Sequence, residues 1–220
     1  MAQTSPFDQP PASPLTRIFL IRHGATEHNI KRPFVLQGSE IDGPLNDTGQ
    51  RQAAALTTAF AGIQLTAVYS SPMQRARETV SQIAKSRALD IQIVEGLREC
   101  QVGRWAGLSW EQIREREPDV VAQFLANPAI EKHPDGESYS DLQARVVPAF
   151  NQILSRHRGE NILIMAHNMV NRVLLSTLLE MDLRHARKIR QTNCCINVLQ
   201  HHDGITDVST INSIWHLDEE

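Results

Sequence analysis

The chain has 220 residues, of which 41% are hydrophobic and 21% charged, and its formal net charge is −3 at pH 7. This balance excludes a bulk attraction to nucleic acid or to anionic lipid, so any anion site must be a local concentration of positive charge. No apolar run approaches the roughly 20 residues that span a bilayer. Since no linker or repeat divides the chain, we predict a single domain over residues 15–220, with neither a membrane nor a nucleic acid as partner.

The N-terminal segment and the cysteines indicate the cellular compartment of the protein. Residues 1–14 are rich in proline, serine, glutamine and alanine, which predicts a flexible tail rather than a signal peptide. The three cysteines, Cys100, Cys194 and Cys195, are a poor disulfide framework, and reduced thiols favour a cytoplasmic protein. The oligomeric state stays open, with a homodimer as one option.

In chain order, apolar patterning predicts a strand over 17–21, an irregular segment over 29–45, a helix from Asn46 or Asp47 to about 60, and a strand over 65–69. The Ser70-Ser71-Pro72 turn predicts the start of a helix that reaches about residue 85. A strand over 91–94, a loop over 101–108 and helical segments over 110–125 follow. We then expect a long helix capped by Ser138 or Ser140, a strand over 161–166, a helix over 170–179, and late strands over 196–199 and 211–215.

Strands that alternate with helices predict a three-layer α/β/α sandwich with a mostly parallel central sheet. In such sheets ligands bind beyond the carboxyl ends of the strands. Three polar groups follow predicted strands directly: His23, the Ser70-Ser71 turn and His167. We expect them to share one site.

These residues suit the binding of a phosphate monoester, which carries about two negative charges near neutral pH. Arg22 and Arg75 can each place a guanidinium fork on two phosphate oxygens. His23 can act as nucleophile if one ring nitrogen is unprotonated and the other is held as a donor. His167, if protonated, adds donors, and Glu99 is the carboxyl group that can protonate a leaving alkoxide, with Glu95 as a rival.

Four elements in this order resemble the histidine phosphatase superfamily, which also contains cofactor-dependent phosphoglycerate mutases. They are Arg22-His23-Gly24 after a strand, Ser71-Pro72 with Arg75 three residues further on, Leu97-Arg98-Glu99, and Ala166-His167 after a second strand. The resemblance covers roughly residues 16–200. It implies a phosphoglycerate mutase-like fold, a phosphohistidine intermediate on His23, and a phosphate pocket of Arg22, Arg75 and His167.

The resemblance also implies that Glu99 is the proton donor, that Asn29 contacts the phosphate, and that neither a metal nor a cofactor is required. Leu36-Gln37-Gly38 and the short segment between Glu99 and Gly136-Glu137-Ser138 look like the phosphatase branch. We include Gln37, Gly38 and Asn168 among the candidate phosphate-binding residues. Asn168 departs from the family, which usually has glycine after the second histidine, and its amide can narrow specificity or impair the reaction.

The sequence therefore predicts a phosphomonoesterase that hydrolyses small organic phosphate esters. Two alternatives stay open: phosphoryl transfer of the phosphoglycerate mutase type, and a phospho-ligand-binding module without turnover. The physiological ester is not defined by the sequence.

Overall fold

A six-stranded sheet in the order β3-β2-β4-β1-β5-β6 forms the centre of the molecule. The computed structural model describes residues 15–217, and the tail predicted over 1–14 lies outside the described residues. Pairing is parallel among β3, β2, β4 and β1, and antiparallel from β1 to β5 and from β5 to β6. The strands are β1 (Thr16–Arg22), β2 (Ala67–Ser70), β3 (Ile91–Ile93), β4 (Asn161–Ala166), β5 (Ile196–His202) and β6 (Ile205–Ser213).

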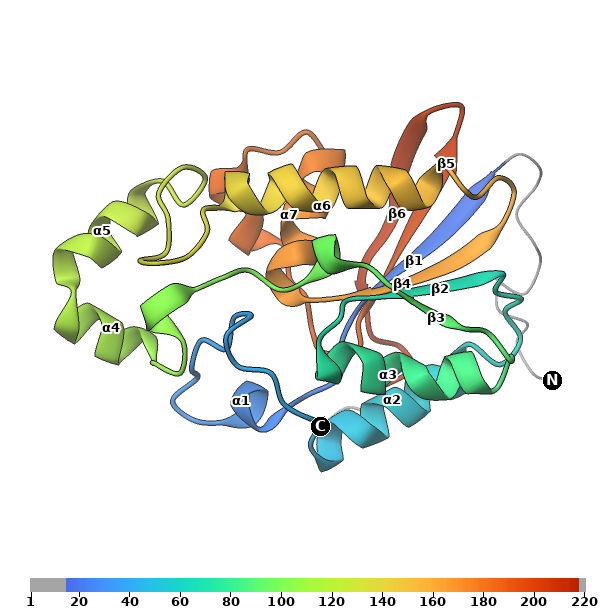
Figure 1. Cartoon of the computed structure of the whole chain (residues 1–220), viewed down its shortest axis with the longest axis horizontal. Helices are drawn as coiled ribbons and strands as arrows, with labels where there is room; N and C mark the ends of the chain where they lie inside the picture. Colours follow the sequence, from blue (N-terminus) through green and yellow to red (C-terminus); the bar gives the residue numbers. More distant parts are fainter. Residues whose placement is uncertain (1–14, 218–220) are drawn as a thin grey trace.

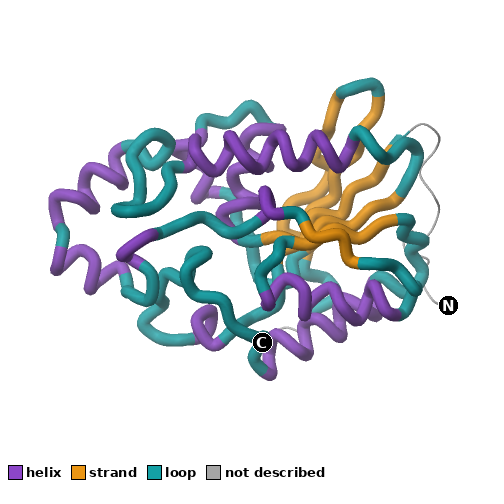
Figure 2. Tube along the Cα trace, in the orientation of Figure 1, coloured by secondary structure: helices purple, strands orange, loops and turns teal. Residues whose placement is uncertain are grey.

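Helices cover both faces of the sheet, which confirms the predicted three-layer α/β/α arrangement. Helices α6 (Tyr139–Leu154) and α7 (Asn168–Leu178) lie on one face, and α2 (Asp47–Ala59) and α3 (Gln74–Lys85) on the other (Figure 1). Figure 2 shows the strands enclosed between these helical layers. The remaining elements are α1 (Glu27–Ile30), α4 (Trp110–Arg116), α5 (Pro118–Ala126) and the 3-10 helices η1 (Glu95–Leu97), η2 (Gly103–Trp105) and η3 (Leu183–Lys188).

The central strands β1 and β4 are mostly apolar because they are buried on both faces. Successive side chains of a strand point to opposite faces. Ile18 and Leu20 of β1 accordingly belong to the core beneath α6 and α7, whereas Phe19 and Ile21 belong to the core beneath α2 and α3. The sheet is thus held rigidly between two apolar layers, and its strand ends are fixed in space.

Several predicted boundaries differ from the structure; β5, for example, runs to His202 rather than to residue 199. Helix α3 does not begin at the Ser70-Ser71-Pro72 turn but at Gln74, because the Asp42 carboxylate accepts the backbone N–H of Gln74 at 3.0 Å and supplies the cap from a distant loop. The last strand is β6, over 205–213 rather than 211–215. It pairs with β5 through the turn at Asp203-Gly204, whose positive φ values of 49° and 80° are typical of a tight hairpin.

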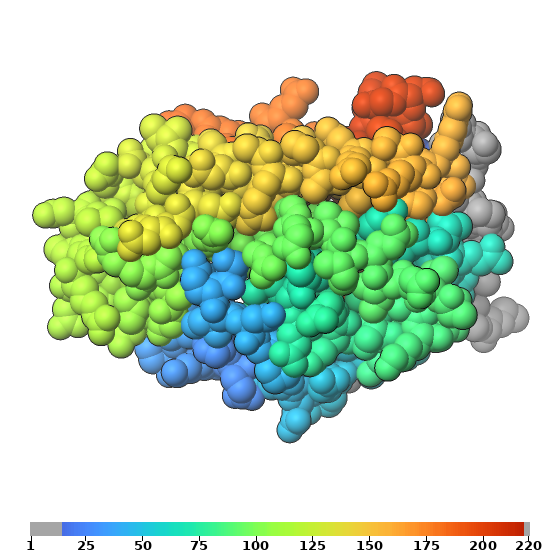
Figure 3. Space-filling view, in the orientation of Figure 1, coloured from blue at the N-terminus to red at the C-terminus, as the bar shows by residue number. Residues whose placement is uncertain are grey.

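The helices α4 and α5 lie away from the sheet and form one end of the molecule. In the space-filling view their yellow-green atoms lie beside the blue atoms of the segment that follows β1 (Figure 3). Across residues 15–217, none of the helices combines the length and the apolar character needed to cross a bilayer.

Candidate active site

The pairing of β1 with β4 brings the two predicted histidines together. Arg22, the last residue of β1, lies in register with Ala166, the last residue of β4. The backbone N–H of His23 donates to the Ala166 carbonyl at 3.1 Å, so the chain leaves both strands at the same edge. The ring centroids of His23 and His167 are 5.1 Å apart. Two residues separated by most of the chain therefore lie side by side at this edge of the sheet, although only His23 lines the pocket.

The ring of His23 has defined roles for its two nitrogens. Its Nδ1 lies 2.7 Å from the Gly24 carbonyl, which can only accept, so Nδ1 carries the proton. Nε2 then keeps its lone pair, and the Nε–H of Arg75 donates to it at 3.3 Å. Burial and the positive charges of Arg75 and Arg22 hold the pKa of His23 well below its usual value. These contacts favour the neutral ring, with the proton on Nδ1 and the lone pair on Nε2.

Arg75, in the first turn of α3, is held in place although it is almost completely buried. Its Nη atoms donate to the carbonyls of Gly38 and Ile41, each at 3.0 Å, and lie 3.5 Å from the Asp42 carboxylate. Gly38 has φ +59°, and a Cβ there would collide with the Val102 side chain. Gly38 therefore acts through its backbone, which holds the Arg75 guanidinium.

Arg22 lines the same pocket from the end of β1. Its Nη1 donates to the Gln191 carbonyl at 2.6 Å, while its buried Nε has no hydrogen-bond partner in the described part of the chain. Burial lowers the pKa of Arg22 to about 10, so the group is still charged at neutral pH.

His167 is fully buried at the start of α7, behind the surface of the pocket. Its Nε2 lies 2.7 Å from the Ser71 hydroxyl, and its Nδ1 has no partner among the described residues. Burial and the charge of Arg75 lower the pKa of His167 well below its usual value. The ring is thus neutral in this structure, where the sequence analysis considered a protonated one.

Glu99 is the carboxyl group that reaches the pocket. It is 7% exposed, and its carboxylate accepts the backbone N–H of Cys100 at 2.9 Å and of Met169 at 3.3 Å. The rival Glu95 has a side chain that is 72% exposed and paired with Arg98, and it does not line the pocket. The geometry therefore favours Glu99 over Glu95.

Three predicted amide side chains also line the pocket. The Oδ1 of Asn29 accepts from the backbone and hydroxyl of Thr26 and from the Asn193 amide at 3.0 to 3.2 Å, which leaves its NH2 group for a ligand. Gln37 accepts from the Thr26 hydroxyl at 3.2 Å, and its buried Nε2 has no partner in the described chain. Asn168, the first residue of α7, lines the pocket with its Oδ1 equally unpaired.

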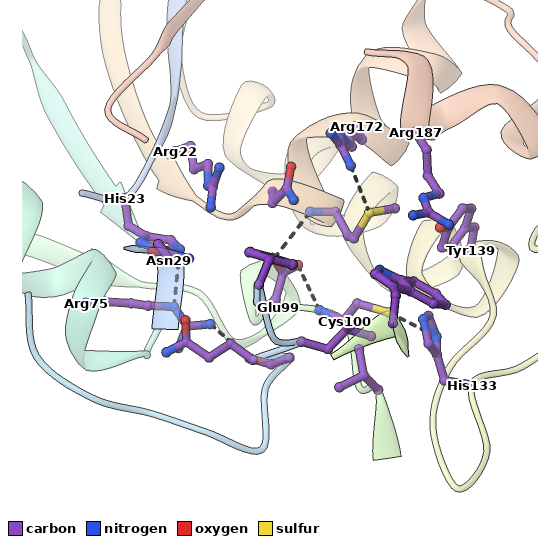
Figure 4. Close-up of a pocket in the computed structure, with 18 residues that line it drawn as sticks. Arg22, His23, Asn29, Arg75, Glu99, Cys100, His133, Tyr139, Arg172 and Arg187 are labelled. Atoms are coloured by element: carbon purple, nitrogen blue, oxygen red, sulfur yellow. Dashed lines mark hydrogen bonds between the residues drawn. The ribbon is translucent and has the colours of Figure 1, made fainter. Parts of the chain in front are cut away.

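The pocket continues well beyond the predicted residues. Figure 4 shows His23, Asn29 and Arg75 at one end, Glu99 in the middle, and Arg172, Arg187, Tyr139 and His133 at the other end. The sequence analysis did not identify this far end. The available signal was Arg172, a cation one turn after Asn168 in an otherwise mostly apolar helix. Over residues 15–217, no group of three or more His, Cys, Asp or Glu side chains is placed to hold a metal ion.

Comparison with known proteins identifies the family of the chain. The model of the histidine phosphatase superfamily (branch 1) matches residues 18–214, and the chain belongs to this superfamily. A metal-independent phosphoserine phosphatase of Arabidopsis thaliana is 31% identical over 208 residues, covering 93% of this chain and 84% of the relative. A probable phosphoglycerate mutase of Shigella boydii is 29% identical over 209 residues, covering 93% of this chain and 96% of the relative.

Solved structures share the fold. YhfR of Bacillus stearothermophilus has a TM-score of 0.85 and 29% identity, with coverage of 92% of this chain and 100% of that chain. Among curated relatives, the chain spans about half the length of mycobacterial proteins that it matches at 30% identity over 206 residues. One of these is a bifunctional protein of Mycobacterium tuberculosis. The match covers 92% of this chain and 55% of that protein.

Proposed function

We propose that this chain is a metal-independent phosphomonoesterase that hydrolyses small organic phosphate esters through a phosphohistidine on His23. The observation that carries the proposal is the orientation of the His23 ring. Its Nδ1 is committed to the Gly24 carbonyl at 2.7 Å, which leaves Nε2 unprotonated, and Nε2 accepts the Nε–H of Arg75 at 3.3 Å. This hydrogen bond is given up when Nε2 attacks phosphorus in the pocket that His23 lines. A nucleophile and the cation that attracts its substrate are thus held side by side.

The first half-reaction transfers the phosphoryl group to the enzyme. His23 Nε2 forms a bond to phosphorus while the bond between phosphorus and the ester oxygen breaks. Arg22 and Arg75 contact the phosphoryl oxygens, whose charge is distributed over three equatorial atoms in the transition state. The amides of Asn29, Gln37 and Asn168 supply further contacts without net charge.

His167 acts as a neutral donor in this proposal. If the Ser71 hydroxyl donates to Nε2, the proton of the ring lies on Nδ1, the atom that has no partner among the described residues. A bound phosphate dianion would also oppose the effect of the surrounding arginines and raise the pKa of His167. Either form of the ring can donate to the phosphoryl group.

Glu99 moves the protons. In the first step its carboxylic acid gives a proton to the leaving alkoxide, and in the second its carboxylate takes one from the water that attacks the phosphohistidine. Inorganic phosphate and the free alcohol are the products. The two backbone N–H groups that the carboxylate accepts fix its position between the two ends of the pocket.

The test is turnover of p-nitrophenyl phosphate and of a panel of sugar phosphates, scored by released phosphate. We expect wild-type activity and no activity of His23→Ala, whose fold is checked by circular dichroism. Wild type equal to His23→Ala on every ester would support the binding module instead. Isomerisation of phosphoglycerate that exceeds hydrolysis in a coupled assay would support the mutase.

A further inference from the structure

The far end of the pocket carries two arginines that phosphate transfer does not use. Arg172 projects from α7, and Arg187 from η3 (Figure 4). Arg172 is half-buried, and its Nε donates to the Ile189 carbonyl at 2.8 Å while its Nη1 contacts the Met169 sulfur at 3.8 Å. Its guanidinium is therefore held in one orientation along the pocket wall.

Arg187 lines the same end of the pocket and lies beside Arg172 in Figure 4. Its guanidinium carbon lies 4.8 Å from the centroid of the Trp110 ring, a distance typical of a cation–π contact. Trp110 is in turn packed against Trp105 and Phe124, with centroid distances of 5.8 and 6.4 Å. The tryptophan thus supports Arg187 without neutralising its charge.

Positive side chains outnumber carboxylates in the lining of the pocket. Four arginines line it, Arg22, Arg75, Arg172 and Arg187, against one carboxylate, Glu99. Within residues 15–217, no Asp or Glu forms an ion pair with Arg22, Arg172 or Arg187. Arg22 and Arg75 lie beside His23, where the ester phosphate would bind, whereas Arg172 and Arg187 line the far end without a carboxylate partner among residues 15–217.

Burial and mutual repulsion destabilise the charged forms of these arginines, and a bound anion would offset both effects. Burial and the positive charge of Arg187 lower the pKa of Arg172. In a chain of net charge −3, these cations lie together at one end of a single cavity. The arrangement is typical of a site that binds anionic groups, because opposite charge stabilises each guanidinium.

We propose that Arg172 and Arg187 form a second anion subsite, which binds an acidic group on the organic body of the substrate. The inference rests on the proposed function and narrows it to esters that carry a second negative charge, either a carboxylate or a second phosphate. Arg172 follows Asn168 by four residues on α7, a rise of about 6 Å along the helix. The organic body that joins the two anionic groups would lie along the apolar walls formed by Leu36, Val102 and Met169.

Matched substrate pairs test this subsite. Glycerol 3-phosphate and 3-phosphoglycerate differ only in a CH2OH group exchanged for a carboxylate. Fructose 6-phosphate and fructose 1,6-bisphosphate differ by a second phosphate. In at least one of the two pairs, the added carboxylate or phosphate should reach the arginines. For that pair we expect wild-type kcat/KM to be about 10-fold to 100-fold higher for the ester with the second acidic group. Equal values within both pairs, or a preference for the neutral members, would overturn the proposal.

Substitutions distinguish a specific effect of the two pocket arginines from a general effect of positive charge near the pocket. Arg172→Gln should reduce the preference ratio about 10-fold, and Arg187→Gln about threefold, because Arg187 is more exposed to screening solvent. Lys188→Gln removes one charge from the same 3-10 helix at a residue that does not line the pocket, and it should change the ratio less than twofold. Because both substrates are measured on one preparation, the ratio does not depend on the folded fraction. Equal effects of all three variants would contradict a specific subsite.

Direct binding distinguishes failure of this inference from failure of the proposed function. On the His23→Ala variant, titration calorimetry should give a lower Kd for the doubly acidic ester than for its neutral counterpart, and Arg172→Gln in that background should remove the difference. If wild type turns over no ester but the binding preference is found, the proposed hydrolysis fails and the subsite holds. If hydrolysis occurs and neither pair shows a preference, the subsite fails alone.

Discussion

Arg145 offers a test of how the position of Glu99 depends on a residue outside the pocket. This arginine of α6 uses all of its donor atoms. Its Nε and Nη2 donate to the two carboxylate oxygens of Glu137 at 2.7 and 2.9 Å. Its Nη atoms also donate to the carbonyls of Gly96, Arg98 and Glu99 at 2.7 to 3.0 Å. Arg145 therefore holds the backbone that carries the proposed acid.

Replacement of Arg145 by Met keeps an unbranched side chain, without the guanidinium group, and removes these five hydrogen bonds. Loss of one partner of a buried ion pair costs about 3–5 kcal/mol. The Arg145 side chain is 27% exposed, so water replaces part of the loss, and we expect about 2–4 kcal/mol. For a chain of this length, that corresponds to a Tm decrease of roughly 5–15 °C.

The assay combines calorimetry with two substrates. We expect Arg145→Met to lower kcat/KM for glycerol 3-phosphate more than for p-nitrophenyl phosphate, since the nitrophenolate leaving group needs little protonation by Glu99. Arg98→Gln is the matched control, because it removes an exposed pair with Glu95 and should cost less than about 1 kcal/mol. A Tm change no larger than that of Arg98→Gln, or equal activity losses on both substrates, would refute the reasoning.

Three further predictions concern the pocket itself. Glu99→Gln should reduce kcat/KM for alkyl phosphates more than for p-nitrophenyl phosphate, and equal reductions would assign the proton transfer to another group. Arg75→Ala should cost about 2–5 kcal/mol of transition-state stabilisation, measured from kcat/KM, and a change below threefold would exclude a direct contact with the phosphoryl group. Because the folded pKa values of His23 and His167 are depressed, the unfolded chain binds more protons below pH 6.5. The free energy of unfolding should then decrease as the pH falls through that value, by up to about 1.4 kcal/mol per pH unit for each ring. His23→Asn should show a shallower decrease in urea titrations, and an unchanged slope would contradict the assignment of His23 as a buried neutral ring.

The sequence predicts the strand ends well because their signals are local. An apolar run stopped by Arg22-His23, and another stopped by His167, identify the edge of the sheet where the pocket lies. The pairing that joins them, Arg22 beside Ala166, is a property of strand order and has no local signal. The same holds for the cap that Asp42 supplies to α3, which moved the start of that helix by several residues.

The far end of the pocket could not be predicted for a similar reason. Arg172 and Arg187 lie on different elements, and each resembles a solvated cation when its own segment is considered alone. Only the packing of η3 against α7, and of α4 toward Arg187, places them in one cavity with His23. Tyr139 and His133 are buried and line the same end of the pocket, and no motif of the sequence marks either of them.

The central claim is that the nitrogen of His23 forms a bond to phosphorus, and chemical trapping tests it most directly. Wild-type protein is mixed with an ester labelled in its phosphoryl group, quenched in alkali within the first turnover, and digested for peptide mapping. We predict an acid-labile, base-stable label on the peptide that contains His23 and no label on His23→Ala. Turnover of the same ester without any label on that peptide, or hydrolysis by His23→Ala at the wild-type rate, would contradict the account.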